Sequence, residues 1–146
     1  MDRPGPLLDE VRDLLQEYGR SLGFGLCFEA FDEELRSLPG RYGPPWGRLL
    51  LEPGCGCVGL QPLDARTAEL KRLYVRPGAR GTGAGRRLAA AAIDAARALG
   101  YQRLLLDTLP ATMGPALALY RSLGFQPIPS WRERPTPGAI ELEKLL

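Results

Sequence analysis

The chain has no histidine among its 146 residues, which removes the side chain that most often serves as a general base. Ser–His and Cys–His nucleophilic sites are excluded for the same reason. Only three cysteines are present, Cys27, Cys55 and Cys57, and a zinc site would need further Cys or His ligands. We therefore expect no metal and small, reduced cysteines, with Cys55 and Cys57 pointing the same way across a strand. Acid–base chemistry is left to carboxylates, tyrosine, lysine, cysteine or water.

The sequence also has little net charge and no long apolar run. A formal charge of +2 is too small to indicate a nucleic-acid or membrane partner. No apolar run approaches the roughly 20 residues of a membrane span, and the N-terminus lacks a secretory pattern, so we expect a cytoplasmic protein. With 45% apolar residues, the length predicts one globular domain over residues 1–146.

Apolar periodicity and Gly and Pro breaks predict a mixed α/β chain. A strand, a crossover helix and another strand imply one parallel pair in an otherwise antiparallel sheet flanked by helices. The predicted helices are Pro6–Gly19, Phe31–Leu38, Gly83–Leu99 and Pro115–Leu123, and the predicted strands are Arg48–Glu52, Cys57–Leu60, Thr67–Arg76, Arg103–Thr108, Phe125–Ile128 and Gly138–Leu142. Arg41–Gly47 and Pro129–Pro137 are predicted loops.

The most informative stretch is Leu70 to Gly85, in which a strand ends at Pro77 and a glycine-rich loop leads into a helix. The backbone N–H groups of a first helical turn and the helix dipole both favour an anion at that point. Arg80 adds a guanidinium that can pair with a phosphate. The local chemistry predicts a pyrophosphate site, with a tight turn that only packs a helix onto a sheet as the alternative.

The spacing of the glycines excludes two familiar phosphate-binding motifs. Gly85 is followed by Arg86 and Arg87, whereas a P-loop ends in Lys–Ser or Lys–Thr. Gly81, Gly83 and Gly85 alternate, and Arg86 stands where a dinucleotide fingerprint has its third glycine. The loop therefore accommodates some other phosphate ligand.

Two spaced motifs resemble the GNAT superfamily of acyl-CoA N-acyltransferases. They read VxPxxRGxGxG over residues 75–85 and AxxLYxxxGF over residues 116–125, in the order that the family uses. The sequence LDTLP over residues 106–110 is further similar to a bacterial subgroup whose members are mostly uncharacterised. The resemblance covers residues 46–128. The family usually opens with a strand before its first helix, and here that strand is expected to be short or absent.

The resemblance implies acetyl-CoA as co-substrate and no metal. Leu73, Tyr74 and Val75 would bind the pantetheine arm through backbone groups, as an added strand binds a sheet edge. Met113 stands where many relatives carry an Asn that touches this arm, which weakens one contact. The remaining cofactor-binding residues implied are Arg80, Gly81, Thr82, Gly83, Ala84, Gly85, Arg86 and Tyr120.

The resemblance also implies catalytic roles. Tyr120 occupies the position of the family's general acid, and a phenol can give a proton or a hydrogen bond to the departing thiolate. Its alternative role is to pack against Leu119 and Leu123. Glu69 is the first candidate for the group that accepts the proton of the amine, and Asp107 is the second. Either carboxylate could instead be solvated or paired with a nearby basic residue, Lys71 or Arg72. The N–H of Val75 is the candidate donor to the oxyanion.

These residues together predict direct transfer of an acetyl group to a primary amine of a small molecule or peptide, within a ternary complex. An inactive acyl-CoA sensor or interaction module is the alternative, and a nucleotide-binding domain is a third. Edge strands could pair two copies into a homodimer. Four residues in predicted loops could bind an acidic or aromatic amine, or could equally be surface and packing residues: Trp46, Trp131, Arg132 and Arg134.

Overall fold

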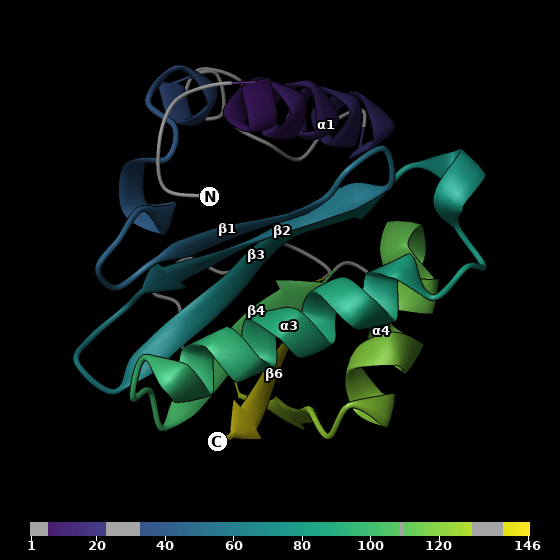
Figure 1. The fold of residues 1–146 in the computed structure, drawn as a ribbon. Coiled ribbons are helices and arrows are strands. Elements are labelled where there is room, and N and C mark those ends of the chain that lie inside the picture. Colours follow the sequence, from purple (N-terminus) through teal and green to yellow (C-terminus); the bar gives the residue numbers. More distant parts are fainter. Residues whose placement is uncertain (1–5, 23–32, 109, 130–138) are drawn as a thin grey trace.

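The computed structural model describes residues 6–22, 33–108, 110–129 and 139–146 (Figure 1). Six strands form one sheet in the order β1-β2-β3-β4-β6-β5. All neighbours are antiparallel except β3 and β4, which are parallel, so the predicted fold class is confirmed. The strands are β1 (Arg48–Glu52), β2 (Gly56–Pro62), β3 (Thr67–Val75), β4 (Arg103–Thr108), β5 (Gln126–Ile128) and β6 (Ile140–Leu145).

Helices cover both faces of this sheet (Figure 1). One face carries α1 (Pro6–Leu22), and the other carries α3 (Ala84–Ala98) and α4 (Pro110–Ser122). Short 3-10 turns, η1 (Gly40–Tyr42) and η2 (Pro77–Ala79), lie before β1 and after β3. Among the described residues, no helix is long and apolar enough to cross a membrane.

Several predicted boundaries were wrong. Helix α1 continues through Gly19 to Leu22, because its buried residues Leu8, Val11, Leu14 and Leu15 outweigh the cost of about 1 kcal/mol for an interior glycine. Helix α4 begins at Pro110 instead of Pro115, since a proline suits the first position of a helix and Pro110 is the earlier one.

The remaining boundaries differ in smaller ways. The predicted second helix is described only as one turn over residues 33–36. Cys55 lies in the turn before β2, whereas Cys57 is a buried strand residue, so the two thiols do not share one face of a strand as predicted. Strand β6 runs on to Leu145, beyond the predicted end at Leu142. Residues 1–5, where the family's opening strand was expected to be short or absent, and the start of the 138–142 strand fall outside the described residues.

The two faces of the sheet support separate hydrophobic cores. Leu70, Leu104 and Leu106 point toward α3 and α4, where Tyr120 and Phe125 complete the larger core. The smaller core lies under α1, and its residues are Leu8, Val11, Leu14, Leu15, Leu35, Leu38, Tyr42, Leu49, Cys57 and Tyr74. Leu105 is buried as well, so β4 is covered on both faces as predicted from its apolar run.

Strand β3 contains an irregularity that determines which side chains face α1. Cys57 pairs with Tyr74 and Gly59 pairs with Lys71, so two residues of β3 stand opposite the single β2 residue between those pairs. This is a β-bulge, and its residue Arg72 has a left-handed φ of 62°. Because of the bulge, Leu73 faces the same core as Leu70, although the two are three positions apart.

The close contact of β2 with η1 depends on Gly59. A Cβ added there would lie 2.7 Å from Cε1 of Tyr42, a distance at which the ring must move. We expect Gly59→Ala to lower the free energy of unfolding by about 1–3 kcal/mol, because the added methyl group would overpack the core against the Tyr42 ring. Urea denaturation followed by fluorescence measures this change.

Gly78→Ala is the matched control, since a Cβ added at Gly78 meets no described atom within 4 Å. Its free energy of unfolding should stay near that of the unmodified protein. Equal stability of the Gly59→Ala and Gly78→Ala proteins would contradict the proposed packing of Tyr42 on β2.

Candidate active site

The glycine loop joins the end of β3 to the start of α3. Gly81 and Gly83 have φ of 82° and 86°, a left-handed conformation in which residues with side chains are strained. Gly83 is the N-cap of α3 and has no side chain with which to cap the first-turn N–H groups. The loop therefore presents backbone donors at the positive end of a helix dipole, as an anion site requires.

Arginine side chains hold this loop in place. Arg87 donates from Nη1 to the carbonyl oxygen of Thr82 at 2.8 Å, and from Nε and Nη2 to the two carboxylate oxygens of Glu52 at 2.8 and 2.7 Å. The hydrogen bond with Arg87 lowers the pKa of Glu52 to about 2. Arg80 donates from Nε to the carbonyl oxygen of Val75 at 3.0 Å.

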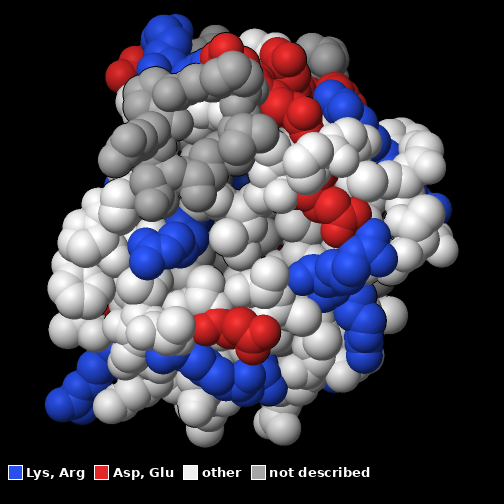
Figure 2. All heavy atoms as spheres, viewed as in Figure 1, with Lys and Arg blue, Asp and Glu red and all other residues white. Residues whose placement is uncertain are grey.

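Basic side chains gather on the same side of the molecule as the loop (Figure 2). Arg86 donates to the hydroxyl of Ser122 at 2.7 Å, which links the first turn of α3 to the last turn of α4. Arg76 precedes the loop and pairs with Glu17 of α1 at 3.0 Å. These contacts connect the loop and its flanking residues to α1, α4 and β1. The surrounding fold therefore holds the loop in its shape.

Next to the loop, β3 and β4 separate. Their parallel pairs are Thr67 with Arg103, Ala68 with Leu104 and Glu69 with Leu105. Beyond Glu69, β3 continues along β2 as far as Val75, whereas the described part of β4 pairs from there only with β6. The edge of β3 that faces β4 is thus placed to receive an extended ligand by strand addition.

Tyr120 lies in α4 on the α3–α4 side of this separation. It is 5% exposed, and its ring packs edge-to-face on Phe125 with centroids 5.7 Å apart. Burial raises the pKa of Tyr120, with smaller contributions from Tyr18 and Asp107. The hydroxyl thus interacts electrostatically with Tyr18 of α1 and Asp107 of β4, while the ring packs in the core. A packing role for the ring and a proposed catalytic role for the hydroxyl are therefore compatible.

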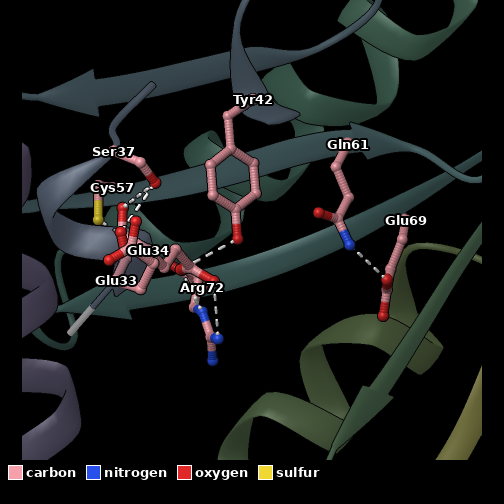
Figure 3. A network of polar contacts seen from close by, with 8 residues as sticks. All are labelled: Glu33, Glu34, Ser37, Tyr42, Cys57, Gln61, Glu69 and Arg72. Atoms are coloured by element: carbon pink, nitrogen blue, oxygen red, sulfur yellow. Dashed lines mark hydrogen bonds and ion pairs between the residues drawn. The ribbon is translucent and has the colours of Figure 1, made fainter. Parts of the chain in front are cut away.

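The two candidate carboxylates lie on the α1 side of the sheet. Glu69 is 1% exposed and accepts a hydrogen bond at 2.8 Å from Nε2 of Gln61, its cross-strand neighbour (Figure 3). Glu69 stands beside Leu105, and Asp107, two residues further along β4, shares the face of Leu105. The structure thus places both carboxylates on one face, at the point where β3 and β4 separate.

Several residues near this point were missed from the sequence. Tyr18 of α1 packs edge-to-face on Tyr74 with centroids 5.9 Å apart. Burial raises the pKa of Tyr18, which the neighbouring Arg72 partly opposes. The signal for Tyr18 was its place at the end of the apolar stripe of the first helix. Arg72, considered above as a partner for Glu69, forms a bidentate pair with Glu34.

Other predicted residues contribute less or lie elsewhere. The side chain of Met113, and all of Trp131, Arg132 and Arg134, lie outside the described residues. Trp46 is exposed, and its carbonyl oxygen accepts a hydrogen bond from the Tyr101 hydroxyl at 2.8 Å. Burial raises the pKa of the Cys57 thiol to about 12, which makes it a poor nucleophile at neutral pH.

The fold and the loop define a class of proteins: α/β proteins in which a glycine loop at the start of a helix lies next to two parallel strands that separate. The sequence profile described as the acetyltransferase (GNAT) family matches residues 10–125. The chain belongs to the GNAT family of acetyltransferases, as the two motifs indicated.

Individual relatives agree with this assignment. The chain is 39% identical over 139 residues to an uncharacterised N-acetyltransferase of Schizosaccharomyces pombe, covering 91% of this chain and 85% of that one. A crystal structure of an acetyltransferase from Streptococcus agalactiae matches with a TM-score of 0.77 at 25% identity, covering 99% of this chain and 94% of that one.

A GNAT acetyltransferase of Elizabethkingia anophelis with acetyl-CoA bound matches with a TM-score of 0.60 at 25% identity, over 81% of this chain and 82% of that one. The residues described above fit such a ligand, because they combine an anion site with an adjacent open strand edge.

The link between Arg87 and the loop can be tested by the binding of CoA. We expect Arg87→Ala to weaken CoA binding about threefold to tenfold, the effect of losing hydrogen bonds that orient the loop. Isothermal titration calorimetry measures the dissociation constant. Arg97→Ala is the control, because Arg97 lies in the same helix and pairs with Asp94, and it should leave binding unchanged.

Glu52→Gln sharpens this test. Removal of a negative charge near an anion site should strengthen CoA binding on Coulombic grounds, whereas loss of the contact with Arg87 should weaken it. We expect weaker or equal binding. A tighter complex of the Glu52→Gln protein would contradict the role of this pair in holding the loop.

Proposed function

We propose that the protein transfers an acetyl group from acetyl-CoA directly to a primary amine of a small molecule or peptide, within a ternary complex. The observation that carries this proposal is the separation of β3 and β4 beside the glycine loop. Tyr120 lies on one side of this separation, and Glu69 and Asp107 lie on the other. Two substrates could therefore approach from opposite faces of the sheet and meet at the same point.

The proposed site for acetyl-CoA follows from the loop and the strand edge. Backbone groups of Leu73, Tyr74 and Val75 would bind the pantetheine arm, and the stretch Arg80 to Arg86 would bind the pyrophosphate. Acetyl-CoA supplies an acetyl group already activated as a thioester, so the chain needs no nucleophile of its own. This agrees with a chain that has no histidine and whose described cysteines have raised pKa values, Cys55 chiefly through Glu52 and Cys57 through burial.

In this proposal Tyr120 serves the departing thiolate. Because its pKa is raised by burial, the hydroxyl stays protonated throughout the neutral range and remains a hydrogen-bond donor. Packing on Phe125 fixes the plane of the ring, which orients the hydroxyl before the reaction begins. The N–H of Val75 would stabilise the oxyanion that develops on the acetyl group.

The acceptor amine must lose a proton, because an ammonium with a pKa near 10.4 has no lone pair to attack the thioester. Glu69 and Asp107 are the proposed proton acceptors, directly or through water. Gln61 orients Glu69 through its amide. GNAT relatives act on amines, which supports the class of acceptor.

Tyr120→Phe tests the proposed acid. The variant keeps the packing on Phe125, so we expect acetyl-CoA affinity to stay within about threefold while kcat falls about a hundredfold, the lower range for general acid catalysis. Thiol release measured across a panel of amines gives both quantities. Tyr101→Phe is the control, since its hydroxyl binds a backbone carbonyl near Trp46. An unchanged kcat for the Tyr120→Phe protein would refute this role.

The proton acceptor can be assigned from the pH dependence of the rate. We expect Glu69→Gln to shift the acidic limb of the kcat/KM profile up to the pKa of the free amine, because only amine already deprotonated in solution can then react. Asp107→Asn should leave the limb in place. The reverse pattern would assign the role to Asp107, and an unshifted limb in both variants would exclude both carboxylates.

A further inference from the structure

The hydroxyl of Thr108 is buried without a hydrogen-bond partner. Thr108 is 2% exposed, and within the part of the chain that the structure describes no group bonds to its Oγ1. A hydroxyl that is withdrawn from water and left unpaired destabilises the folded state, and most buried polar atoms in proteins are paired. The described fold supplies no partner for this hydroxyl, so a molecule from outside the chain is a candidate to supply one.

Thr108 is the last residue of β4, where this strand has ceased to pair with β3. The last parallel pair is Glu69 with Leu105, and from there to Thr108 the described pairing of β4 is with β6. Counted along both strands from that last pair, Thr108 stands level with Arg72, the residue before Leu73. Thr108 therefore borders the separation of β3 and β4, on the side opposite the proposed ligand-binding edge.

The side chain of Thr108 lies on the α3–α4 side of the sheet. Directly opposite residues of an antiparallel pair share a face, and Thr108 pairs with Ile140, which packs against the larger core. Leu106, two residues earlier in β4, is buried in that same core, as alternation along a strand requires. Tyr120 belongs to this core as well. The unpaired hydroxyl is thus on the side of the sheet that would serve the departing thiolate.

The place of Thr108 along the separation indicates which end of acetyl-CoA it would meet. The glycine loop follows the Val75 end of the strand edge, so the pyrophosphate would lie at that end. Thr108 is level with the opposite end, next to Leu73. The part of the pantetheine arm beside Thr108 would therefore be the part that carries the sulfur. An amide of the arm lies close to this sulfur, and a hydroxyl can donate to an amide carbonyl.

We propose that the Thr108 hydroxyl donates a hydrogen bond to the carbonyl oxygen of the pantetheine amide nearest the sulfur, and so fixes the thioester relative to Tyr120. The inference rests on the proposed acetyl transfer, since it requires acetyl-CoA between β3 and β4. A threonine suits this role, because its branched Cβ restricts χ1 and orients the hydroxyl before the ligand binds. Thr108 binds the co-substrate and transfers no proton, so it adds to the role of Tyr120 without replacing it.

Thr108→Val tests this contact, because valine keeps the branched shape and removes the hydroxyl. We expect the dissociation constant of CoA, measured by isothermal titration calorimetry, to rise about fivefold to tenfold, the effect of one lost hydrogen bond. Acetyl-CoA should show the same rise, since both ligands contain the amide. A rise for acetyl-CoA with unchanged binding of CoA would overturn the assignment to the amide.

The stability of the ligand-free protein separates this role from a structural one. Loss of an unpaired buried hydroxyl should leave the Tm of the Thr108→Val protein equal or higher, while the rise in Tm on saturation with CoA becomes smaller. Thr67→Val is the matched control, since Thr67 is buried in β3 and its hydroxyl bonds to the Asp64 carboxylate. Its Tm should fall, and its affinity for CoA should stay unchanged.

A serine variant completes the test. Thr108→Ser keeps the hydroxyl without the methyl group, so it should bind CoA within about twofold of the unmodified protein. Equal losses of affinity in the valine and serine variants would assign the effect to packing and overturn the inference. A lower Tm of ligand-free Thr108→Val, or unchanged binding of CoA by it, would also overturn this inference alone. Failure of the unmodified protein to bind CoA would contradict the proposed function with it.

Discussion

The structure depends on the incomplete pairing of β3. This strand pairs with β2 over nearly its whole length but with β4 over only its first three residues. From Leu70 to Val75, the edge of β3 that faces β4 is not paired with β4. The backbone groups of such an edge need hydrogen-bond partners, which makes it a place where a ligand can bind. The glycine loop begins where this edge ends, so a ligand held by the loop can extend along the strand. One constraint thus determines where the proposed phosphate-binding loop and the proposed ligand-binding strand edge meet.

The sheet also divides the chemistry between its two faces. The α3–α4 face contributes Tyr120, whose raised pKa keeps its hydroxyl protonated as a hydrogen-bond donor. The α1 face contributes Glu69 and Asp107, the proposed proton acceptors, together with Lys71 and Arg72. The sheet lies between Tyr120 and the two carboxylates, and the proposed reaction would bring the two sides together where β3 and β4 separate.

A feature of the candidate site could be predicted from the sequence when its residues lie close together along the chain. Arg80 to Gly85 were identifiable because a loop of this kind uses consecutive residues, and Tyr120 was identifiable through its spacing to Gly124 and Phe125. The contact of Arg72 with Glu34 joins residues 38 positions apart, and no short pattern records it. The start of α4 was misplaced because Pro110 and Pro115 both suit a first helical turn, and only the packing of the helix chooses between them.

By itself, the sequence determined the family, the order of helices and strands, the parallel pair and the glycine loop, since each follows from periodicity, turn residues or closely spaced motifs. The tertiary structure decided which residues face α1. A bulge of one extra residue in β3 reverses the alternation of side chains between the two faces from that point on. Arg72 therefore points toward α1, whereas in a regular strand it would point into the core under α3 and α4. Alternation along the sequence cannot reveal it, because the bulge is a property of the pairing between β2 and β3.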